Sequence, residues 1–313
     1  MSRTDSDWRE VIGLRSPTEE RNPRTRAIDQ LPARELVSLV MAEDRAVLDA
    51  VAAVTGPVAE LVERAVAAIA AGGRVHYVGS GTSGRLGVLD AVELLPTYDV
   101  GEEAFRAHLA GGEGAMMLAV EGAEDDADAG RALGSQLTRL DLVVGLTASG
   151  RTPFVAGALE AARGLGAATA LLSTNPAAPL AGQVDVAVLV DTGPEVVTGS
   201  TRMKAATAQK MVLNTFSTAV MVRLGKTFSN LMIQVRPTNQ KLRARTVRML
   251  VQATGREPGR CADVLEEAGG RVRVALVALL AGRRPRRAPR PRAAYGCSRS
   301  RPCASSPRTS AST

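Results

Sequence analysis

The chain has 313 residues, of which 45% are hydrophobic and 23% are charged, a composition typical of soluble globular proteins and unlike that of disordered or fibrous chains. At roughly 150 residues per domain, this length predicts about two domains, or one domain with an appendage. No stretch approaches the ~20 uninterrupted apolar residues of a membrane span. Residues 1–26 are charged throughout and lack the apolar core of a secretory signal, so we expect a cytoplasmic protein.

The net charge of +7 comes from the end of the chain. Residues 283–313 contain nine arginines and no acidic residue, which leaves 30 basic and 32 acidic residues elsewhere and a net charge of −2 there. The remainder therefore offers no basic surface for a nucleic-acid partner. With three cysteines and two histidines in all, a disulfide framework is excluded and neither a Cys/His metal cluster nor another metal site is expected.

The first part of the chain changes its periodicity at residue 74. Residues 1–32 are expected to form an extended N-terminal arm, because prolines at 17, 23 and 32 interrupt any helix. Residues 33–54 and 57–71 place apolar residues at helical spacing. They are followed by a short apolar run at 74–79 that predicts a buried strand, a loop at 80–84, and a helical pattern at 85–94.

The strand–loop–helix unit recurs further along the chain. Residues 141–147 predict a strand, 148–153 a loop and 154–164 a helix, with further strands at 168–173 and 184–190. Strands that alternate with helices of 10–15 residues indicate βαβ units. We therefore expect an α/β fold over residues 33–235, a three-layer sandwich with a parallel sheet.

The last part of the chain is predicted to be helical and then disordered. Residues 203–225, 239–253 and 261–280 have helical patterns, and we assign 236–282 to a short, incomplete C-terminal helical region. The Arg-, Pro- and Ser-rich tail at 283–313 is expected to be disordered. Such a tail is what a high-GC gene yields when it is read out of frame, so we hypothesise a frameshift.

The two loops after the strands have the composition of a phosphate-binding site. Thr82 and Ser83 lie among glycines at the start of a helix, where N–H groups and the helix dipole favour an anion. Residues 79–84 also match GxGxxG, the fingerprint of dinucleotide-binding loops. That site needs an acidic residue at the end of the next strand, whereas Glu102 and Glu103 come before the next apolar stretch. Simple helix capping is a third possibility. The second loop has hydroxyls in the same place, and ligands of parallel sheets bind at such strand ends.

Five stretches resemble N-acetylmuramic acid 6-phosphate etherases, which are sugar-isomerase (SIS) fold enzymes of cell-wall recycling. They are residues 18–22 (TEERN), 77–90 (YVGSGTSGRLGVLD), 119–125 (AVEGAED), 147–153 (TASGRTP) and 198–210 (TGSTRMKAATAQK). The resemblance runs from about residue 18 to about 282. The chain departs from the family pattern at three places. Val92 stands where a small hydroxyl residue is usual, and Leu94 and Leu95 stand before Pro96 where Cys-Pro is usual. Ala206 stands where glycine is usual.

This resemblance implies a lyase that removes D-lactate from N-acetylmuramate 6-phosphate and adds water, giving N-acetylglucosamine 6-phosphate. It implies a homodimer, no cofactor, and two catalytic carboxylates, Glu93 and Glu124. Glu93 is expected to protonate the leaving lactate between apolar neighbours that desolvate it, and Glu124 to be the base; the reverse assignment stays open. The expected substrate-binding residues are Gly81, Thr82, Ser83, Ser149, Gly150, Thr152, Ser200, Arg202 and Lys204.

Each of these residues also has an ordinary structural interpretation. Glu93 could be a surface residue near a helix end, Glu124 could cap the next helix, and the basic residues after 200 could form a solvated helix face. His76, inside a predicted strand, is expected to pack in the core. Two other functions stay open: a non-catalytic sugar-phosphate-binding regulator like glucokinase regulatory protein, and a sugar-phosphate isomerase.

Overall fold

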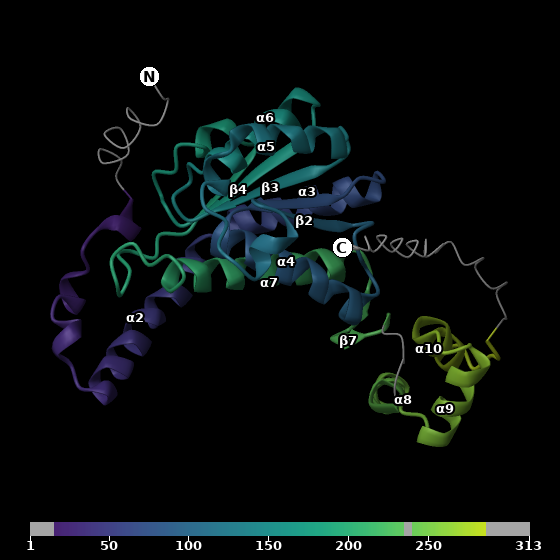
Figure 1. Ribbon diagram of the computed structural model, residues 1–313. Helices are drawn as coiled ribbons and strands as arrows, with labels where there is room; N and C mark the ends of the chain where they lie inside the picture. Colours follow the sequence, from purple (N-terminus) through teal and green to yellow (C-terminus); the bar gives the residue numbers. More distant parts are fainter. Residues whose placement is uncertain (1–15, 235–239, 286–313) are drawn as a thin grey trace, which may run out of the picture.

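The computed structural model describes residues 16–234 and 240–285, and Figure 1 shows a central sheet with helices on both faces. The sheet is parallel, in the strand order β2-β1-β3-β4-β5. Its strands are β1 (Val75–Gly79), β2 (Phe105–Leu109), β3 (Leu142–Thr147), β4 (Ala168–Ser173) and β5 (Val186–Leu189). The predicted three-layer α/β sandwich is confirmed.

Both faces of the sheet are covered, which explains why its central strands are apolar without alternation. Every residue of β1 and β3 is buried. The helices on one face are α2 (Ala33–Ala53), α3 (Thr55–Ala70), α4 (Gly81–Tyr98) and α7 (Lys204–Arg223). The other face is covered by α6 (Pro153–Gly164), on which α5 (Ala127–Ala132) packs. Tyr77, Phe105 and Phe216 form an aromatic cluster in the first layer.

The strand order creates a switch point between β1 and β3. After β1 the chain crosses to β2 on one side, whereas after β3 it crosses to β4 on the other. Gly79, at the end of β1, pairs in register with Leu146, one residue before the end of β3. The loops that follow these two strands therefore leave the same edge of the sheet side by side, where ligands of open α/β sheets bind.

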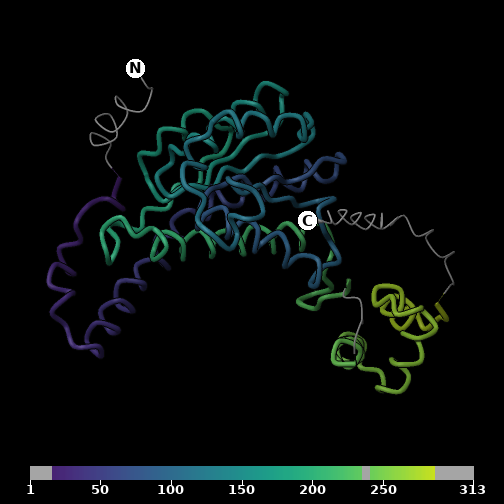
Figure 2. Tube along the Cα trace, in the orientation of Figure 1, coloured from purple at the N-terminus to yellow at the C-terminus, as the bar shows by residue number. Residues whose placement is uncertain are grey.

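The N-terminal arm docks on the sandwich instead of running free. It forms short 3-10 turns at Pro17–Glu19, Pro23–Thr25 and Ile28–Gln30, so the expected extended arm is locally coiled where it is described. Figure 2 shows how the arm and the first part of α2 extend beyond the sheet. Further 3-10 turns lie at Glu113–Met116, Ala123–Asp125, Leu133–Gln136 and Ala181–Gln183.

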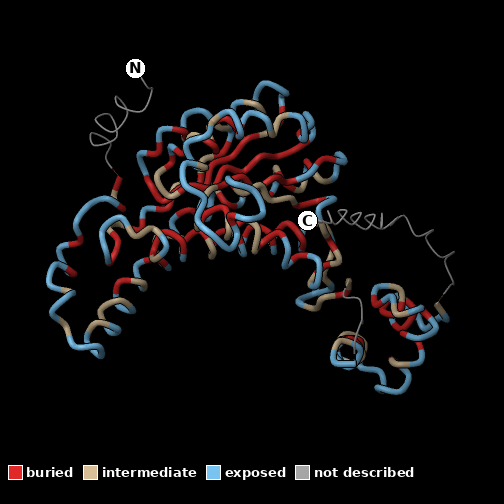
Figure 3. The backbone as a smooth tube through the Cα atoms, viewed as in Figure 1, coloured by how far each residue is buried: buried red, intermediate tan, exposed pale blue. Residues whose placement is uncertain are grey.

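Three C-terminal helices form a second small core. A short hairpin of β6 (Thr227–Phe228) and β7 (Leu231–Met232) precedes α8 (Gln240–Thr254), α9 (Pro258–Glu267) and α10 (Val272–Leu280). Their buried faces, red in Figure 3, meet around residues such as Leu250, Val264 and Leu276. The helical run expected at 261–280 is two helices, because Gly269 and Gly270 adopt φ values of 64° and 76° between them.

Two predictions concern residues outside those that the structure describes. The domain boundary at 235 and the tail from 286 to 313 both lie there. Within the described ranges, no helix is long and apolar enough to cross a membrane.

Candidate active site

The first strand-end loop passes directly into α4. The helix begins at Gly81, which has a φ of 51°, four residues before the predicted start. Gly84 packs on the end of β1 so closely that a Cβ there would lie 2.5 Å from the Gly79 carbonyl oxygen. Only glycine permits this approach. It places Thr82, half-buried, and Ser83, buried, in the first turn of α4 beside the neighbouring loop.

The second loop is held by its own hydroxyl groups. The Thr147 hydroxyl lies 2.7 Å from that of Thr152 and accepts a hydrogen bond from the Gly150 backbone N–H at 3.2 Å. Gly150 has a φ of 74°, and a Cβ there would lie 2.2 Å from the Ala178 Cβ. The half-buried Ser149 keeps its hydroxyl 3.3 Å from that of Thr147. The loop is thus fixed before any ligand binds.

Residues after β4 support this loop from behind. The Ser173 hydroxyl donates to the Ala148 carbonyl at 3.0 Å, and the Asn175 side-chain amide donates to the Ser149 carbonyl at 3.0 Å. Neither residue was predicted from the sequence. Their position at the carboxyl end of a third parallel strand is the signal that could have identified them.

Glu124 lies beside the first loop. The Ser80 hydroxyl donates to Glu124 Oε2 at 3.5 Å, although 44 residues separate the two in the sequence. Arg85 fixes the segment before Glu124, because its guanidinium donates to the Ala115 and Met116 carbonyls at 3.0 and 3.2 Å and to Leu118 at 3.3 Å. Sequence analysis missed this role for Arg85. The carboxylate is exposed and free to meet a ligand at the strand ends.

Glu93 lies on the outer face of α4, about three turns beyond the loop. Its side chain is exposed, and so are those of Val92 (58%) and Leu95 (56%). The sequence predicts that Val92 and Leu94 desolvate Glu93. Leu94 is indeed buried, but it packs in the core, and Glu93 itself stays exposed, so this desolvation is not found within a single chain. α4 also continues through Pro96 to Tyr98, past the predicted end at residue 94.

The basic residues around the start of α7 do not meet the strand-end loops as a group. Glu195, fully buried, accepts the backbone N–H groups of Lys204 and Ala205 at 2.9 Å each, so a carboxylate already occupies this helix N-terminus. The Lys204 ammonium is buried 3.3 Å from Glu43 Oε2. Ser200 is half-buried and Arg202 is exposed. Sequence analysis missed the Glu43 partner, which is far away in the chain.

The histidines belong to the packed sheet. His76 is fully buried, as expected, and stacks on His108 with its Nδ1 2.9 Å from His108 Nε2. Burial lowers the pKa of both imidazoles, that of His108 to about 4, so both are neutral at physiological pH. In the described part of the chain, no group of three His, Cys, Asp or Glu side chains is arranged to hold a metal ion.

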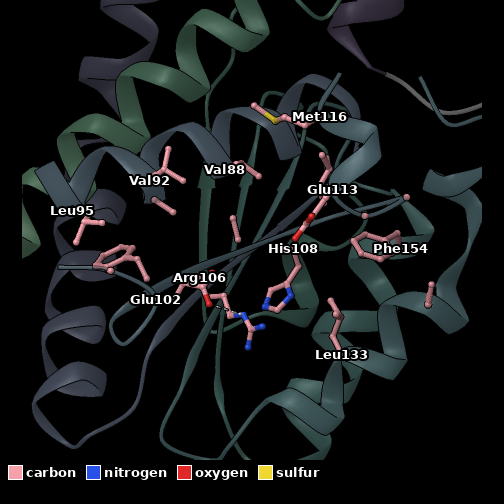
Figure 4. Close-up of a pocket in the computed structure, with 18 residues that line it drawn as sticks. Val88, Val92, Leu95, Glu102, Arg106, His108, Glu113, Met116, Leu133 and Phe154 are labelled. Carbon is pink, nitrogen blue, oxygen red and sulfur yellow. Dashed lines mark ion pairs between the residues drawn. The ribbon is translucent and has the colours of Figure 1, made fainter. Parts of the chain in front are cut away.

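A largely apolar cavity of about 950 Å³ lies along the edge strand β2, to the side of the strand-end loops. Figure 4 shows Val92 and Leu95 of α4 on one side of it and Leu133 and Phe154 on the other, with Arg106 and His108 of β2 between them. The α4 side chains that line the cavity are Val88, Ala91, Val92 and Leu95, and Glu93 is not one of the lining residues.

The chain is similar to known proteins over most of its length. Residues 57–163 match the family described as glucokinase regulatory protein N-terminal SIS domain. Over 85% of its length the chain is 53% identical to the N-acetylmuramic acid 6-phosphate etherase of Thermobifida fusca, and the match covers 88% of that protein. Over the same share of its length it is 50% identical to the etherase of Serratia proteamaculans, and the match covers 90% of that protein. It is 49% identical to the etherase of Cutibacterium acnes, again over 85% of this chain and 88% of that protein. Identity at this level across nearly the whole length places the chain in the N-acetylmuramic acid 6-phosphate etherase family.

Proposed function

We propose that the protein is a carbon–oxygen lyase that cleaves the D-lactyl ether of N-acetylmuramate 6-phosphate. The products are D-lactate and N-acetylglucosamine 6-phosphate, in cell-wall recycling. The observation that carries this proposal is the position of Glu124 beside the first of two preorganised strand-end loops, 3.5 Å from Ser80. The etherase names of relatives about 50% identical over 85% of the chain support the same substrate.

The loops supply the phosphate contacts. Gly81, Thr82 and Ser83 offer N–H and hydroxyl donors at the N-terminus of an 18-residue helix, whose dipole favours an anion. Ser149, Gly150 and Thr152 offer the same groups from the neighbouring strand. Ser200, Arg202 and Lys204 stay predicted contacts. For Lys204, binding would require the ammonium to leave the buried partner Glu43.

The chemistry then consists of proton transfers. In the open-chain sugar the aldehyde at C1 accepts the electrons released when the C2 proton is removed, and the lactyl ether at C3 leaves as the β substituent. Glu124 takes the C2 proton, Glu93 protonates the departing ether oxygen, and water adds to the C2–C3 double bond at C3. General acid–base groups of this kind typically contribute about 10²- to 10⁴-fold each.

The proposal includes the state and surroundings of the protein. The protein forms a homodimer, and its partner is a small sugar phosphate, with no role for nucleic acid. The protein acts in the cytoplasm, because the charge of a phosphorylated sugar keeps that sugar from crossing the membrane. The acidic balance outside the C-terminal tail supports the absence of a nucleic-acid partner.

The regulator and isomerase interpretations are less favoured. A non-catalytic regulator needs the phosphate loops but no carboxylates, whereas this chain has both Glu93 and Glu124. The match to the glucokinase regulatory protein family covers residues 57–163, while the etherase relatives align over 85% of the chain.

The test is to incubate the purified protein with N-acetylmuramate 6-phosphate and to assay free D-lactate enzymatically. We expect stoichiometric D-lactate and N-acetylglucosamine 6-phosphate. A folded protein that binds the sugar phosphate without releasing lactate would support the regulator instead, and a ketose product would support the isomerase.

A further inference from the structure

We infer that Arg151 binds the carboxylate of the lactyl group and thereby distinguishes the substrate from the sugar product. This inference rests on the proposed function and deepens it, because N-acetylmuramate 6-phosphate carries two anions: the phosphate on C6 and the lactyl carboxylate on C3. The backbone N–H groups and hydroxyls of the strand-end loops account for the phosphate. The carboxylate needs a cation of its own, since an unpaired charge is costly to remove from water.

Arg151 lies inside the second strand-end loop, directly after Ser149 and Gly150. The backbone on both sides of it is fixed. Gly150 has a φ of 74° and donates its N–H to the Thr147 hydroxyl, and Thr152 is the N-cap residue of α6. The Arg151 side chain is exposed and makes no ion pair or hydrogen bond with any residue that the structure describes. The loop therefore holds this arginine in place and leaves its guanidinium available to a ligand.

The other cations at the starts of the neighbouring helices are less suited to this role. The Arg85 guanidinium already donates to three backbone carbonyls, and the Lys204 ammonium is buried against Glu43. Arg202 is exposed, but it lies just before α7, where the Glu195 carboxylate accepts two backbone N–H groups. That negative charge disfavours a second anion nearby. The arginine of the second loop is thus left as the partner of the lactyl carboxylate.

The lengths of the substrate and of the side chain agree. Eight covalent bonds join the phosphorus to the carboxyl carbon of the lactyl group, and an extended chain advances about 1.2 Å per bond, so the two anions lie at most about 10 Å apart. Six bonds join the Cα of an arginine to its terminal nitrogens, which gives about 7 Å, and a hydrogen bond adds about 3 Å. Arg151 therefore reaches the carboxylate while Ser149 and Gly150 contact the phosphate.

A guanidinium is suited to this contact, because its planar set of donors matches a carboxylate with two parallel hydrogen bonds. The contact also separates substrate from product. The carboxylate leaves with D-lactate, so N-acetylglucosamine 6-phosphate keeps the phosphate contacts but has no group for Arg151 to bind. The site consequently holds the substrate more tightly than the sugar that it has to release.

A double-mutant cycle between protein and ligand tests the contact by calorimetric titration. The two proteins are Glu124→Gln, which consumes the ligand only slowly, and Glu124→Gln/Arg151→Gln. The two ligands are N-acetylmuramate 6-phosphate and its lactyl amide, in which a neutral group of similar shape replaces the carboxylate. We expect the first protein to bind the carboxylate ligand about 10- to 100-fold more tightly than the amide. The second protein should bind both ligands about equally.

Three controls accompany the cycle. N-acetylglucosamine 6-phosphate should bind with the same affinity whether residue 151 is arginine or glutamine, because it has no lactyl group. Arg151→Lys should keep part of the preference for the carboxylate, since it retains the charge but not the paired donors. Arg139→Gln should keep the whole preference, because Arg139 is an exposed arginine before the amino end of β3, whereas Arg151 follows the carboxyl end.

Several outcomes would overturn this role. One is a preference for the carboxylate that survives Arg151→Gln or is absent from the Glu124→Gln protein itself. A preference that is lost in Arg202→Gln instead would assign the contact to Arg202. Loss of N-acetylglucosamine 6-phosphate binding in Arg151→Gln would assign Arg151 to the phosphate. All of these leave the lyase function intact if the wild-type protein releases D-lactate, whereas a wild-type protein that releases none overturns the proposed function itself.

Discussion

Arg85 connects the first strand-end loop to the segment that leads to Glu124. It lies one residue after the glycine that packs on β1, and its guanidinium reaches three carbonyl oxygens of the segment that leads to Glu124. A planar guanidinium can donate to several carbonyls at once, whereas an ammonium acts as a point charge. Arg85 is therefore a positioning residue for Glu124.

We expect Arg85→Lys to lower kcat about 10- to 100-fold with little change in KM, since lost charge-assisted hydrogen bonds cost about 1.5–3 kcal/mol. Limited proteolysis should also cut residues 111–126 faster in the variant while the thermal midpoint of unfolding changes little. Arg64→Lys is the control, because Arg64 pairs with the exposed Glu60 one turn away on the same surface helix. Unchanged kcat and proteolysis would contradict the positioning role.

The two glutamates should affect turnover and not binding. For Glu93→Gln and Glu124→Gln we expect kcat for D-lactate release to fall by about 10²- to 10⁴-fold, because an amide cannot donate or accept the transferred proton. Calorimetric titration with N-acetylglucosamine 6-phosphate should give a nearly unchanged dissociation constant. Glu121→Gln is the matched control in the same acidic stretch, and near-normal turnover in either test variant would refute its assignment.

At the scale of elements, a buried carboxylate joins the strand and the two helices that carry the site. Asp90 of α4 accepts hydrogen bonds from the Tyr77 hydroxyl of β1 at 2.8 Å and from the Ser217 hydroxyl of α7 at 3.0 Å. Burial raises its pKa to about 6, although these hydrogen bonds act in the opposite direction. At neutral pH the carboxylate of Asp90 is therefore ionised although it is buried, and Lys210 only partly offsets the cost of its burial.

The sign of its effect on stability follows from linkage. A carboxyl whose pKa is higher in the folded state binds its proton more tightly there, so stability falls as pH rises from about 4 to about 6. Asp90→Asn removes this cost and should stabilise the protein at pH 7.5 by on the order of 2 kcal/mol, with little gain at pH 4. Urea unfolding at both pH values measures it, with the exposed Asp125→Asn as control; equal effects at both pH values would contradict it.

Elements with strong local signals were predictable from the sequence. β4 was predicted to the residue and β1 and β3 to within one, because central parallel strands are continuous apolar runs bounded by glycine or polar residues. The boundaries of α4 were not, because Gly81 and Gly84 indicate a loop locally, whereas the helix already begins at Gly81 and packs tightly on Gly79 through Gly84. Pro96 likewise lies inside the helix.

The candidate site was predictable as motifs but not as a geometry. The strand-end positions of Thr82 and Ser149 follow from the βαβ pattern. The exposure of Glu93 and the ion pair of Lys204 do not, because both depend on packing between segments far apart in the chain. The spacing of residues 198–210 alone predicts that the start of this helix binds an anionic ligand. In the structure, the Glu195 carboxylate already accepts the backbone N–H groups there.

At the scale of the whole molecule, Glu43 joins the arm, α2 and α7. It is 4% exposed, pairs with Arg24 of the arm, accepts a hydrogen bond from the Asn22 side chain at 2.7 Å, and lies 3.3 Å from Lys204 Nζ. The hydrogen bond from Arg24, above all, lowers the pKa of Glu43 to about 2, with smaller contributions from Asn22 and Lys204. The arm is further held by the Thr25 hydroxyl, which donates to the Val196 carbonyl at 2.8 Å.

The Glu43 carboxylate stabilises the folded protein because its pKa is lower there than in the unfolded chain. This stabilisation is present above about pH 4.5 and is lost as the pH falls toward about 2. We expect Glu43→Gln to destabilise the protein at pH 7 by on the order of 3 kcal/mol, because it leaves the buried Lys204 charge unpaired, and to abolish that acid-dependent loss. Chemical unfolding between pH 2.5 and 7 measures both. Glu63→Gln, which breaks an exposed pair with Arg223, should do neither.

The separation of Glu43 and Lys204 by 161 residues has a consequence for synthesis. A ribosome that adds about 5–20 residues per second makes Lys204 roughly 8 to 32 s after Glu43. During that interval the Glu43 carboxylate lacks the ammonium that pairs with it in the folded protein, although its partners Asn22 and Arg24 in the arm are already present. The set of contacts around Glu43 is thus completed only after the start of α7 has left the exit tunnel.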